Sequence, residues 1–165
     1  MIGILVLLSG GFPVIFSQKR AGQGSTLFYI YKFRTMKIDT PNVASNLLKD
    51  PGKYLLAVGG LLRKLSLDEL PNLVNIAKGD MSFVGPRPAL FNQFDLLQLR
   101  LDAGVTMLKP GLTGWAQING RDKLSVEEKV ALEKEYLEKK SFLLDVSIVI
   151  RTVFFIFSKK EEVNH

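Results

Sequence analysis

The spacing of hydrophobic and polar positions changes several times along the chain, and each change predicts an element. Two β-rich runs flank a glycine-rich segment at residues 21–26 and together predict a β-hairpin. Alternation in the second run places Lys32 and Arg34 on one face, where the pattern alone favours a solvated strand end. The residues expected to face the core are those of the other face, Leu27, Tyr29, Tyr31 and Phe33.

After the hairpin, apolar residues recur at the spacing of helices. The stretch 61–78 has this spacing, and Ser66 with Glu69 fits the capping box S-x-x-E, so a helix is expected to begin at Ser66. Pro71 then falls at the end of the first turn, where its missing N–H costs little. The other expected helices are a short one near 44–49, one over 92–101, and a charged one over 126–140 that opens with a second capping box, Ser125 to Glu128.

Strongly apolar segments lie near both ends of the chain. Ile2–Leu8 is apolar throughout, has no basic residue before it as a signal peptide would, and is too short to span a bilayer. It is either a buried strand, a frayed end, or the tail of a longer hydrophobic element. The segment 141–160 is interrupted by Asp145 and Arg151, which favours a core helix or a helix lying in a membrane interface with its basic end at the headgroups.

These elements together predict an α+β fold with a small β-hairpin, several helices and amphipathic membrane-interface helices, in a single domain of 165 residues. The net charge of +6 favours anionic partners: nucleic acid, phosphorylated small molecules or an anionic membrane. The cations are dispersed and match no nucleic-acid-binding motif, so nucleic acid is not expected as a partner. Cysteine is absent and the one histidine is His165, so thiolate, histidine-triad and zinc chemistry are not expected.

Adjacent carboxylates lie in an otherwise apolar stretch, RKLSLDELPNL at residues 63–73. Asp68 and Glu69 have two interpretations. In the first, Glu69 completes the capping box and Asp68 complements the helix dipole. In the second, they form an acidic dyad in which one carboxylate attacks phosphorus and its neighbour holds Mg²⁺, with backbone N–H groups of the helix end binding phosphate oxygens. The two interpretations are compatible.

Cations for such chemistry occur nearby in the sequence. Arg63 and Lys64 directly precede the pair, and Arg87 lies between two prolines in GPRP. A guanidinium on a stiff loop suits bidentate phosphate binding, although an ordinary loop arginine has the same appearance. Asp80 follows a glycine and is expected to cap a turn and not to bind metal.

Three more polar residues lie in KPGLTGWAQINGR, residues 109–121, whose glycines and proline predict an ordered irregular loop. Gln117, Asn119 and Arg121 alternate with apolar residues. They are either one face of a short strand or a set of polar contacts to a nucleotide and a sugar.

Four blocks of the sequence resemble the bacterial sugar transferase family, the monotopic phosphoglycosyl transferases. The resemblance extends from about Pro13 to Phe157 and includes, in order, PVIFSQKRAGQG, YIYKFRTM, SLDELPNLVNIAKGDMSFVGPRP and KPGLTGWAQINGR. It implies transfer of a phosphosugar from a UDP-sugar to a membrane polyprenyl phosphate such as undecaprenyl phosphate. The implied products are a polyprenyl diphosphate sugar and UMP, in the first membrane step of exopolysaccharide or O-antigen assembly.

The resemblance also implies roles for individual residues. Asp68 would be the nucleophile of a ping-pong reaction through a phosphosugar–enzyme ester, and Glu69 its partner, with Mg²⁺ held by both. Arg87 would contact phosphate, and Arg63 and Lys32 are weaker candidates for the same contact. The active site is expected to face the cytoplasm from the bacterial inner membrane.

One feature departs from the resemblance. Members of the family begin with a longer hydrophobic re-entrant segment, and residues 1–12 are expected to be its remnant. Residues 13–157 would then be the catalytic domain and 158–165 a tail. The alternative is that the chain is an inactive truncated copy, a basic module that binds membrane surfaces without catalysis.

Overall fold

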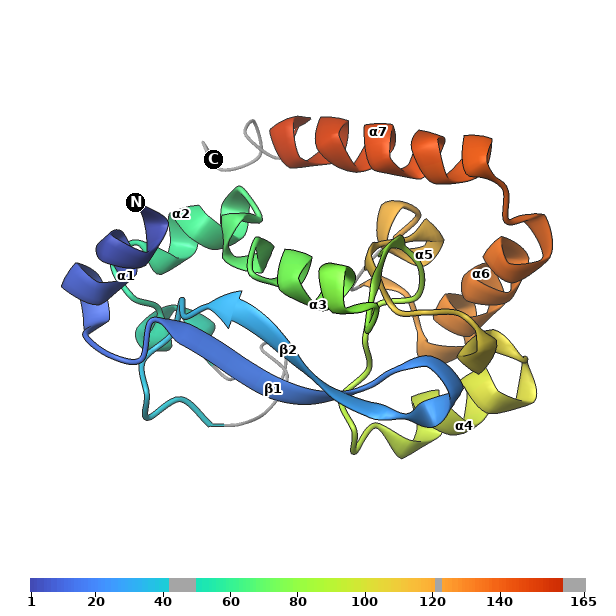
Figure 1. Cartoon of the computed structure of the whole chain (residues 1–165), viewed down its shortest axis with the longest axis horizontal. Coiled ribbons are helices and arrows are strands. Elements are labelled where there is room, and N and C mark those ends of the chain that lie inside the picture. The colour runs from blue at the N-terminus through green and yellow to red at the C-terminus, as the bar shows by residue number, and fades with distance from the viewer. Residues whose placement is uncertain (42–49, 121–122, 159–165) are drawn as a thin grey trace. The chain divides into compact units, whose positions relative to one another are not determined.

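The computed structural model describes residues 1–41, 50–120 and 123–158, so the helix expected near 44–49 lies outside the described residues. The chain forms two compact units. The first comprises Met1–Ser17 and Tyr31–Pro71, and the second comprises Gln18–Ile30 and Asn72–His165. The hairpin of β1 (Ile15–Ala21) and β2 (Leu27–Phe33) is present as predicted, with a short 3₁₀ turn, η1 (Gln23–Ser25), between the strands (Figure 1).

The first unit is built from helices around a small apolar cluster. Its elements are α1 (Ile2–Gly10), η3 (Pro51–Tyr54), α2 (Gly59–Lys64) and η4 (Leu67–Glu69). The buried cluster is formed by Val6, Leu56 and Leu62. The apolar run at the N-terminus is therefore helical, and of the three alternatives the buried strand is wrong. A helix satisfies its own backbone hydrogen bonds and needs no neighbouring strand.

Arg34 closes the end of α1. Its guanidinium donates to the carbonyl oxygens of Gly10 at 2.7 Å, Gly11 at 2.6 Å and Pro13 at 2.6 Å. The last carbonyls of a helix have no partner within it, so a buried cation there stabilises the helix end. The predicted solvated strand end is wrong for Arg34, whose exposed fraction is 6%.

The predicted core face of β2 is wrong for Leu27 and Tyr29, although Phe33 on the same face packs against the apolar cluster of the first unit. Leu27 and Tyr29 are about half exposed, at 53% and 52%, whereas Ile30 on the opposite face is 3% exposed. Alternation identifies which residues share a face of a strand, but the packing of the rest of the chain decides which face is buried.

The second unit contains most of the helices. They are α3 (Asn72–Lys78), α4 (Phe94–Asp102), η5 (Val105–Met107), α5 (Trp115–Ile118), α6 (Val126–Lys139) and α7 (Phe142–Ser158). Two short strands, β3 (Ser82–Val84) and β4 (Gly111–Thr113), pair in parallel with Ser82 opposite Gly111 and Val84 opposite Thr113. The unit has two apolar clusters, one around Val84, Leu108, Tyr136 and Ile148 and the other around Ala89, Leu96 and Val130.

The segment expected to be an irregular loop, residues 109–121, contains regular structure. β4 and α5 lie within it, so the predicted loop is wrong for residues 111–113 and 115–118. Its glycines permit close backbone contact: a Cβ on Gly111 would lie 2.2 Å from the Gly85 nitrogen, and one on Gly114 would lie 2.1 Å from the Gly85 oxygen. Glycine is required here because no larger residue allows the two backbones to approach so closely.

The helices near the C-terminus agree largely with the sequence prediction. α6 begins with the predicted capping box, in which the Ser125 hydroxyl accepts from the Glu128 nitrogen and the Glu128 carboxylate accepts from the Ser125 nitrogen. α7 covers the apolar segment; it buries Ile148 completely, but Phe142 and Phe154 are more than 70% exposed. Within residues 1–41, 50–120 and 123–158, the helices are all too short or too polar to cross a bilayer.

Candidate active site

Asp68 and Glu69 lie in the segment DELPN, where the helical structure is interrupted between the end of α2 and the start of α3 in the sequence. The single helix expected to begin at Ser66 is wrong: α2 ends at Lys64, Ser66 has left-handed backbone angles (φ 55°), and η4 follows as one 3₁₀ turn. The Ser66 side chain makes no capping hydrogen bond, so the predicted capping box is wrong as well. The helical N–H groups next to Ser66 are therefore those of a single 3₁₀ turn.

The local sequence explains this break. Pro71 has no N–H and its ring crowds the carbonyl four residues before it, so one continuous helix through 61–78 would lose hydrogen bonds. Leu67 packs against the apolar cluster of the first unit and fixes the turn from its buried side. The turn then presents both carboxylates in consecutive positions.

Glu69 is held by a cation. The Lys32 Nζ donates to the Glu69 Oε1 at 2.6 Å, and both side chains are only 17% exposed. This contact replaces the predicted cap on Glu69 and corrects the prediction of a solvated strand end for Lys32. A partly buried pair of this kind is screened little by salt and holds both side chains in one geometry.

Asp68 is the more buried carboxylate, with an exposed fraction of 8%. Burial raises the pKa of Asp68, Lys32 and Arg63 lower it by their positive charges, and the charge of Glu69 raises it. The net result is a pKa above the ordinary value of 3.8. A carboxylate that is poorly hydrated and more basic than usual is a stronger nucleophile than one in water. The first unit thus brings Asp68, Glu69, Lys32 and Arg63 together, as four of the predicted site residues.

The acidic residues of this turn suit Mg²⁺ bound mainly through a substrate. Among the described side chains, no group of three or more histidine, cysteine or acidic residues is arranged to hold a metal ion. Mg²⁺ in phosphate-transfer sites typically uses one or two carboxylates, with phosphate oxygens and water completing its shell. Asp68 and Glu69 provide that number of carboxylates.

Arg87 belongs to the second unit, on the loop between β3 and α4. Its side chain is exposed, while the backbone around it is buried and hydrogen-bonded. Gly85 donates to the Thr113 oxygen at 2.9 Å and Gly111 donates to the Pro86 oxygen at 2.8 Å. The stiff loop predicted for GPRP is therefore anchored on the β3–β4 pair.

The remaining candidates have internal partners in the second unit. The Gln117 amide donates to the Leu112 oxygen at 3.2 Å. The Asn119 amide donates to the Trp115 oxygen at 2.9 Å and accepts from Arg151 at 3.3 Å. The alternative of a short strand for these residues is wrong, because α5 turns through this segment. Their contacts to nucleotide and sugar stay predictions, and Arg121 lies outside the described residues.

Other charges in the second unit are accounted for by the structure. Asp80 accepts from the Asn75 side chain at 3.3 Å within the turn after α3, in agreement with its predicted turn position. Asp145 accepts from the Tyr136 hydroxyl at 2.6 Å, and burial raises the pKa of Tyr136. The Arg151 guanidinium lies 5.4 Å from the centre of the Trp115 ring. The two charges that interrupt the apolar run of α7 are thus both paired.

A buried ion pair, Arg100 with Glu133, was not predicted from the sequence. Its signal was present in the helical spacing: Arg100 follows the buried Leu96 by four residues, and Glu133 lies three residues from both Val130 and Tyr136. Opposite charges on the apolar faces of two helices indicate that those faces pack together.

Similarity to known proteins identifies the family of this chain. Residues 1–159 match the bacterial sugar transferase family. The chain is 47% identical to an uncharacterized sugar transferase, EpsL, of Bacillus subtilis, over 90% of this chain and 72% of that protein. The chain therefore belongs to the bacterial sugar transferase family, a family of enzymes, as the sequence blocks implied.

Relatives with more specific names are more distant. The UDP-glucose:undecaprenyl-phosphate glucose-1-phosphate transferase of Escherichia coli is 37% identical, over 96% of this chain and 36% of that protein. The UDP-N-acetylgalactosamine-undecaprenyl-phosphate N-acetylgalactosaminephosphotransferase of Aeromonas hydrophila is 35% identical, over 91% of this chain and 37% of that protein. These relatives act on different sugars.

Proposed function

We propose that this protein transfers a sugar phosphate from a UDP-sugar to undecaprenyl phosphate, or a related polyprenyl phosphate, in exopolysaccharide or O-antigen assembly. The observation that carries the proposal is the buried Asp68, next to Glu69 and the cations Lys32 and Arg63, in a chain of the sugar transferase family. The names of the relatives support the general reaction, since they pair undecaprenyl phosphate with sugar phosphates.

The first half of the reaction uses Asp68 as the nucleophile. A carboxylate oxygen of Asp68 attacks the phosphorus that bears the sugar, the bond from that phosphorus to the bridging oxygen breaks, and UMP leaves with the electron pair. The product is a phosphosugar ester of Asp68. Lys32 and Arg63 favour this step because they offset the negative charge of the donor near two carboxylates.

The second half regenerates the enzyme. A phosphate oxygen of the polyprenyl phosphate attacks the same phosphorus, and the bond to Asp68 breaks. The polyprenyl diphosphate sugar forms and Asp68 is again a free carboxylate. Splitting the transfer into two displacements lets one site serve a soluble donor and a lipid acceptor in turn.

Mg²⁺ would be held by Asp68 and Glu69 and would neutralise charge on the phosphates. Glu69 keeps its orientation through Lys32. Arg87 is proposed to bind a phosphate oxygen, while Gln117, Asn119 and Arg121 are proposed to contact the nucleotide and sugar. The lipid acceptor implies a bacterial membrane, and the soluble donor implies its cytoplasmic face.

The test is UMP release by the full chain in nanodiscs with Mg²⁺, undecaprenyl phosphate and a panel of UDP-sugars. We expect release with at least one donor, and loss of release in Asp68→Asn. Full turnover by Asp68→Asn would contradict the role of Asp68. Absence of release with every donor, together with binding to vesicles that increases with anionic lipid, would favour a non-catalytic membrane-surface module.

A further inference from the structure

The backbone carbonyl oxygens of the loop that carries Arg87 accept hydrogen bonds from other parts of the second unit. Pro86 and Pro88 have no N–H, so the segment cannot form a regular ladder of its own. Nevertheless each of the four consecutive carbonyl oxygens from Pro86 to Ala89 accepts a hydrogen bond. Gly111 and Ala21 supply two of the donors from their backbones, at 2.8 and 3.0 Å.

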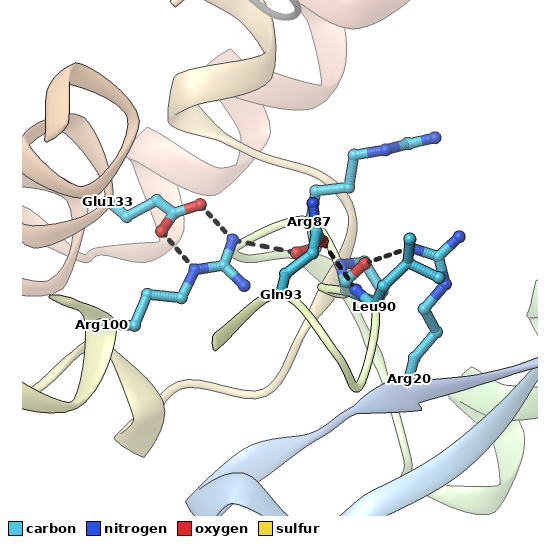
Figure 2. Close-up of polar contacts among 7 residues, drawn as sticks. Arg20, Arg87, Leu90, Gln93, Arg100 and Glu133 are labelled. Carbon is cyan, nitrogen blue, oxygen red and sulfur yellow. Dashed lines mark hydrogen bonds and ion pairs between the residues drawn. The ribbon is translucent and has the colours of Figure 1, made fainter. Parts of the chain in front are cut away.

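The other two donors are arginine side chains, and Figure 2 shows both. The Arg100 Nη2 donates to the Arg87 oxygen at 3.0 Å, and the Arg20 Nη1 donates to the Pro88 oxygen at 3.1 Å. The loop backbone is therefore held by side chains at both Arg87 and Pro88. Since the two donors come from different elements, α4 and β1, the loop is held between them.

Arg100 is itself fixed by Glu133. The carboxylate of Glu133 on α6 accepts from the Arg100 Nε at 2.7 Å and from its Nη2 at 2.5 Å, and the two residues are 6% and 3% exposed. A two-pronged contact of this kind leaves the guanidinium one orientation, which directs its Nη2 at the Arg87 oxygen. The Arg87 side chain points away from the pair (Figure 2) and is exposed.

We infer that Arg100, oriented by Glu133, is a positioning residue that fixes the backbone of Arg87 so that the Arg87 guanidinium meets phosphate in one orientation. The inference rests on the proposed function, because it assumes that Arg87 binds a phosphate of the substrates. Stability alone is a weak reason for the pair: a buried ion pair can often be replaced by apolar residues at little cost. An apolar pair would pack equally well but would leave the Arg87 oxygen without its donor.

The first test measures the loop without using activity. The variant Arg100→Met/Glu133→Leu removes both charges and keeps the apolar volume. We expect a folded protein with a similar melting temperature, in which the loop amides of Gly85, Leu90 and Gly111 exchange hydrogen about tenfold faster or more, because a charged hydrogen bond is lost. Gln98→Ala is the matched control, since Gln98 lies on the same helix and donates to the exposed Asp102. Unchanged exchange in a folded double variant would overturn the inference, whatever the enzyme does.

The second test asks whether Arg100 acts through Arg87. In the wild-type background we expect the double variant to lower kcat/KM for the UDP-sugar by about 10- to 100-fold, the usual effect of losing a supporting contact. In an Arg87→Ala background the same two substitutions should lower it by less than about threefold, since coupled residues are not additive. Equal losses in both backgrounds would overturn the inference and indicate a general effect on the fold.

The two tests also separate this inference from the proposed function. If Arg87→Ala has full activity while the exchange result holds, the pair positions the loop but Arg87 does not bind the substrates' phosphate, which overturns the functional part of the inference only. If the wild-type chain transfers no sugar phosphate from any donor, the proposed function fails, and the exchange experiment still decides whether the pair fixes the loop.

Discussion

Two segments of this protein have nearly the same four residues and opposite structures. SVEE at 125–128 begins α6 with a complete capping box. SLDE at 66–69 forms no box: Ser66 has left-handed backbone angles and Glu69 pairs with Lys32. The first segment is exposed, so the local pattern decides its structure.

The second segment is governed by its surroundings. Leu67 packs into the apolar cluster, Asp68 is buried, and a lysine from β2 occupies the carboxylate that a cap would have used. Sites at which local rules fail in an otherwise consistent sequence are commonly functional, because their residues are arranged for chemistry and not for stability. The comparison thus supports the proposal that SLDE is the reactive segment, whereas SVEE caps a helix.

The largest difference in activity is expected between substitutions at the third position of each segment, Asp68 and Glu127. Asp68→Asn should lower kcat/KM for UMP release by about 1,000-fold or more, because a carboxamide cannot act as the nucleophile. Glu127→Gln, the matched change in SVEE, should stay within about twofold of wild type, as expected of a substitution on an exposed helix end. Asp68 would not be the nucleophile if Asp68→Asn kept more than about a tenth of the wild-type activity.

The role of Lys32, which pairs with Glu69, can be tested by the pH dependence of the rate. Lys32→Met should lower kcat/KM by about 10- to 100-fold. It should also move the acid limb of the pH–rate profile upward: burial already raises the pKa of Asp68, Lys32 lowers it, and transfer needs the ionised carboxylate.

The control is Lys139→Met, which removes the exposed Lys139–Glu135 pair of α6. It should leave the profile unchanged. An acid limb that stays in place, or moves to lower pH, in Lys32→Met would show that Lys32 does not act on the ionisation of Asp68.

The serines test the structural half of the comparison. Ser125→Ala should cost about 1 kcal/mol of unfolding free energy, since a capping hydrogen bond is lost. That cost corresponds to roughly 2–4 °C in the melting temperature of a protein of this size.

Ser66 should respond differently. Ser66→Ala should change stability by less than about 0.5 kcal/mol, as no cap is lost, and Ser66→Gly should stabilise by about 1 kcal/mol, because glycine adopts φ 55° without strain. Thermal denaturation of the variants measures both effects. Equal losses in Ser66→Ala and Ser125→Ala would mean that both serines cap helices.

Removal of the nucleophile is also expected to increase the stability of the protein. The pKa of Asp68 is raised in the folded protein, so the folded state binds more protons than the unfolded state between the ordinary and the raised value. The stability of the wild type therefore falls as pH rises through the folded pKa and stays lower above it.

Asp68→Asn removes this penalty. At neutral pH it should raise the melting temperature by no more than about 4 °C. The gain should shrink as pH falls through the folded pKa of Asp68. A variant less stable than wild type at neutral pH would indicate that the ionised carboxylate contributes to the fold.

Local sequence patterns predicted those elements that depend on local interactions. The hairpin, the helix after Ser125 and the turn at Gly79–Asp80 are governed by turn residues, capping and spacing over a few positions. The acidic pair itself was also identified, because adjacent like charges in an apolar stretch are costly without a partner. These features require no knowledge of distant parts of the chain.

The failures have a common physical cause. Lys32 lies 37 positions before Glu69, and Arg34 lies 24 positions after Gly10, so their pairings depend on the fold. The Arg100–Glu133 pair, separated by 33 positions, is of the same kind. In all three cases the sequence shows a charge on or beside an apolar face, and only packing identifies its partner.

The most direct test of the role of Asp68 is mass spectrometry of the protein mixed with Mg²⁺ and UDP-sugars in the absence of a lipid acceptor. We expect a mass increase equal to one sugar phosphate, located on the peptide that contains Asp68 and lost when undecaprenyl phosphate is added. Glu127→Gln should gain the same mass and Asp68→Asn should not. UMP formation upon acceptor addition, with no adduct on Asp68 at any time and undiminished turnover in Asp68→Asn, would contradict that role.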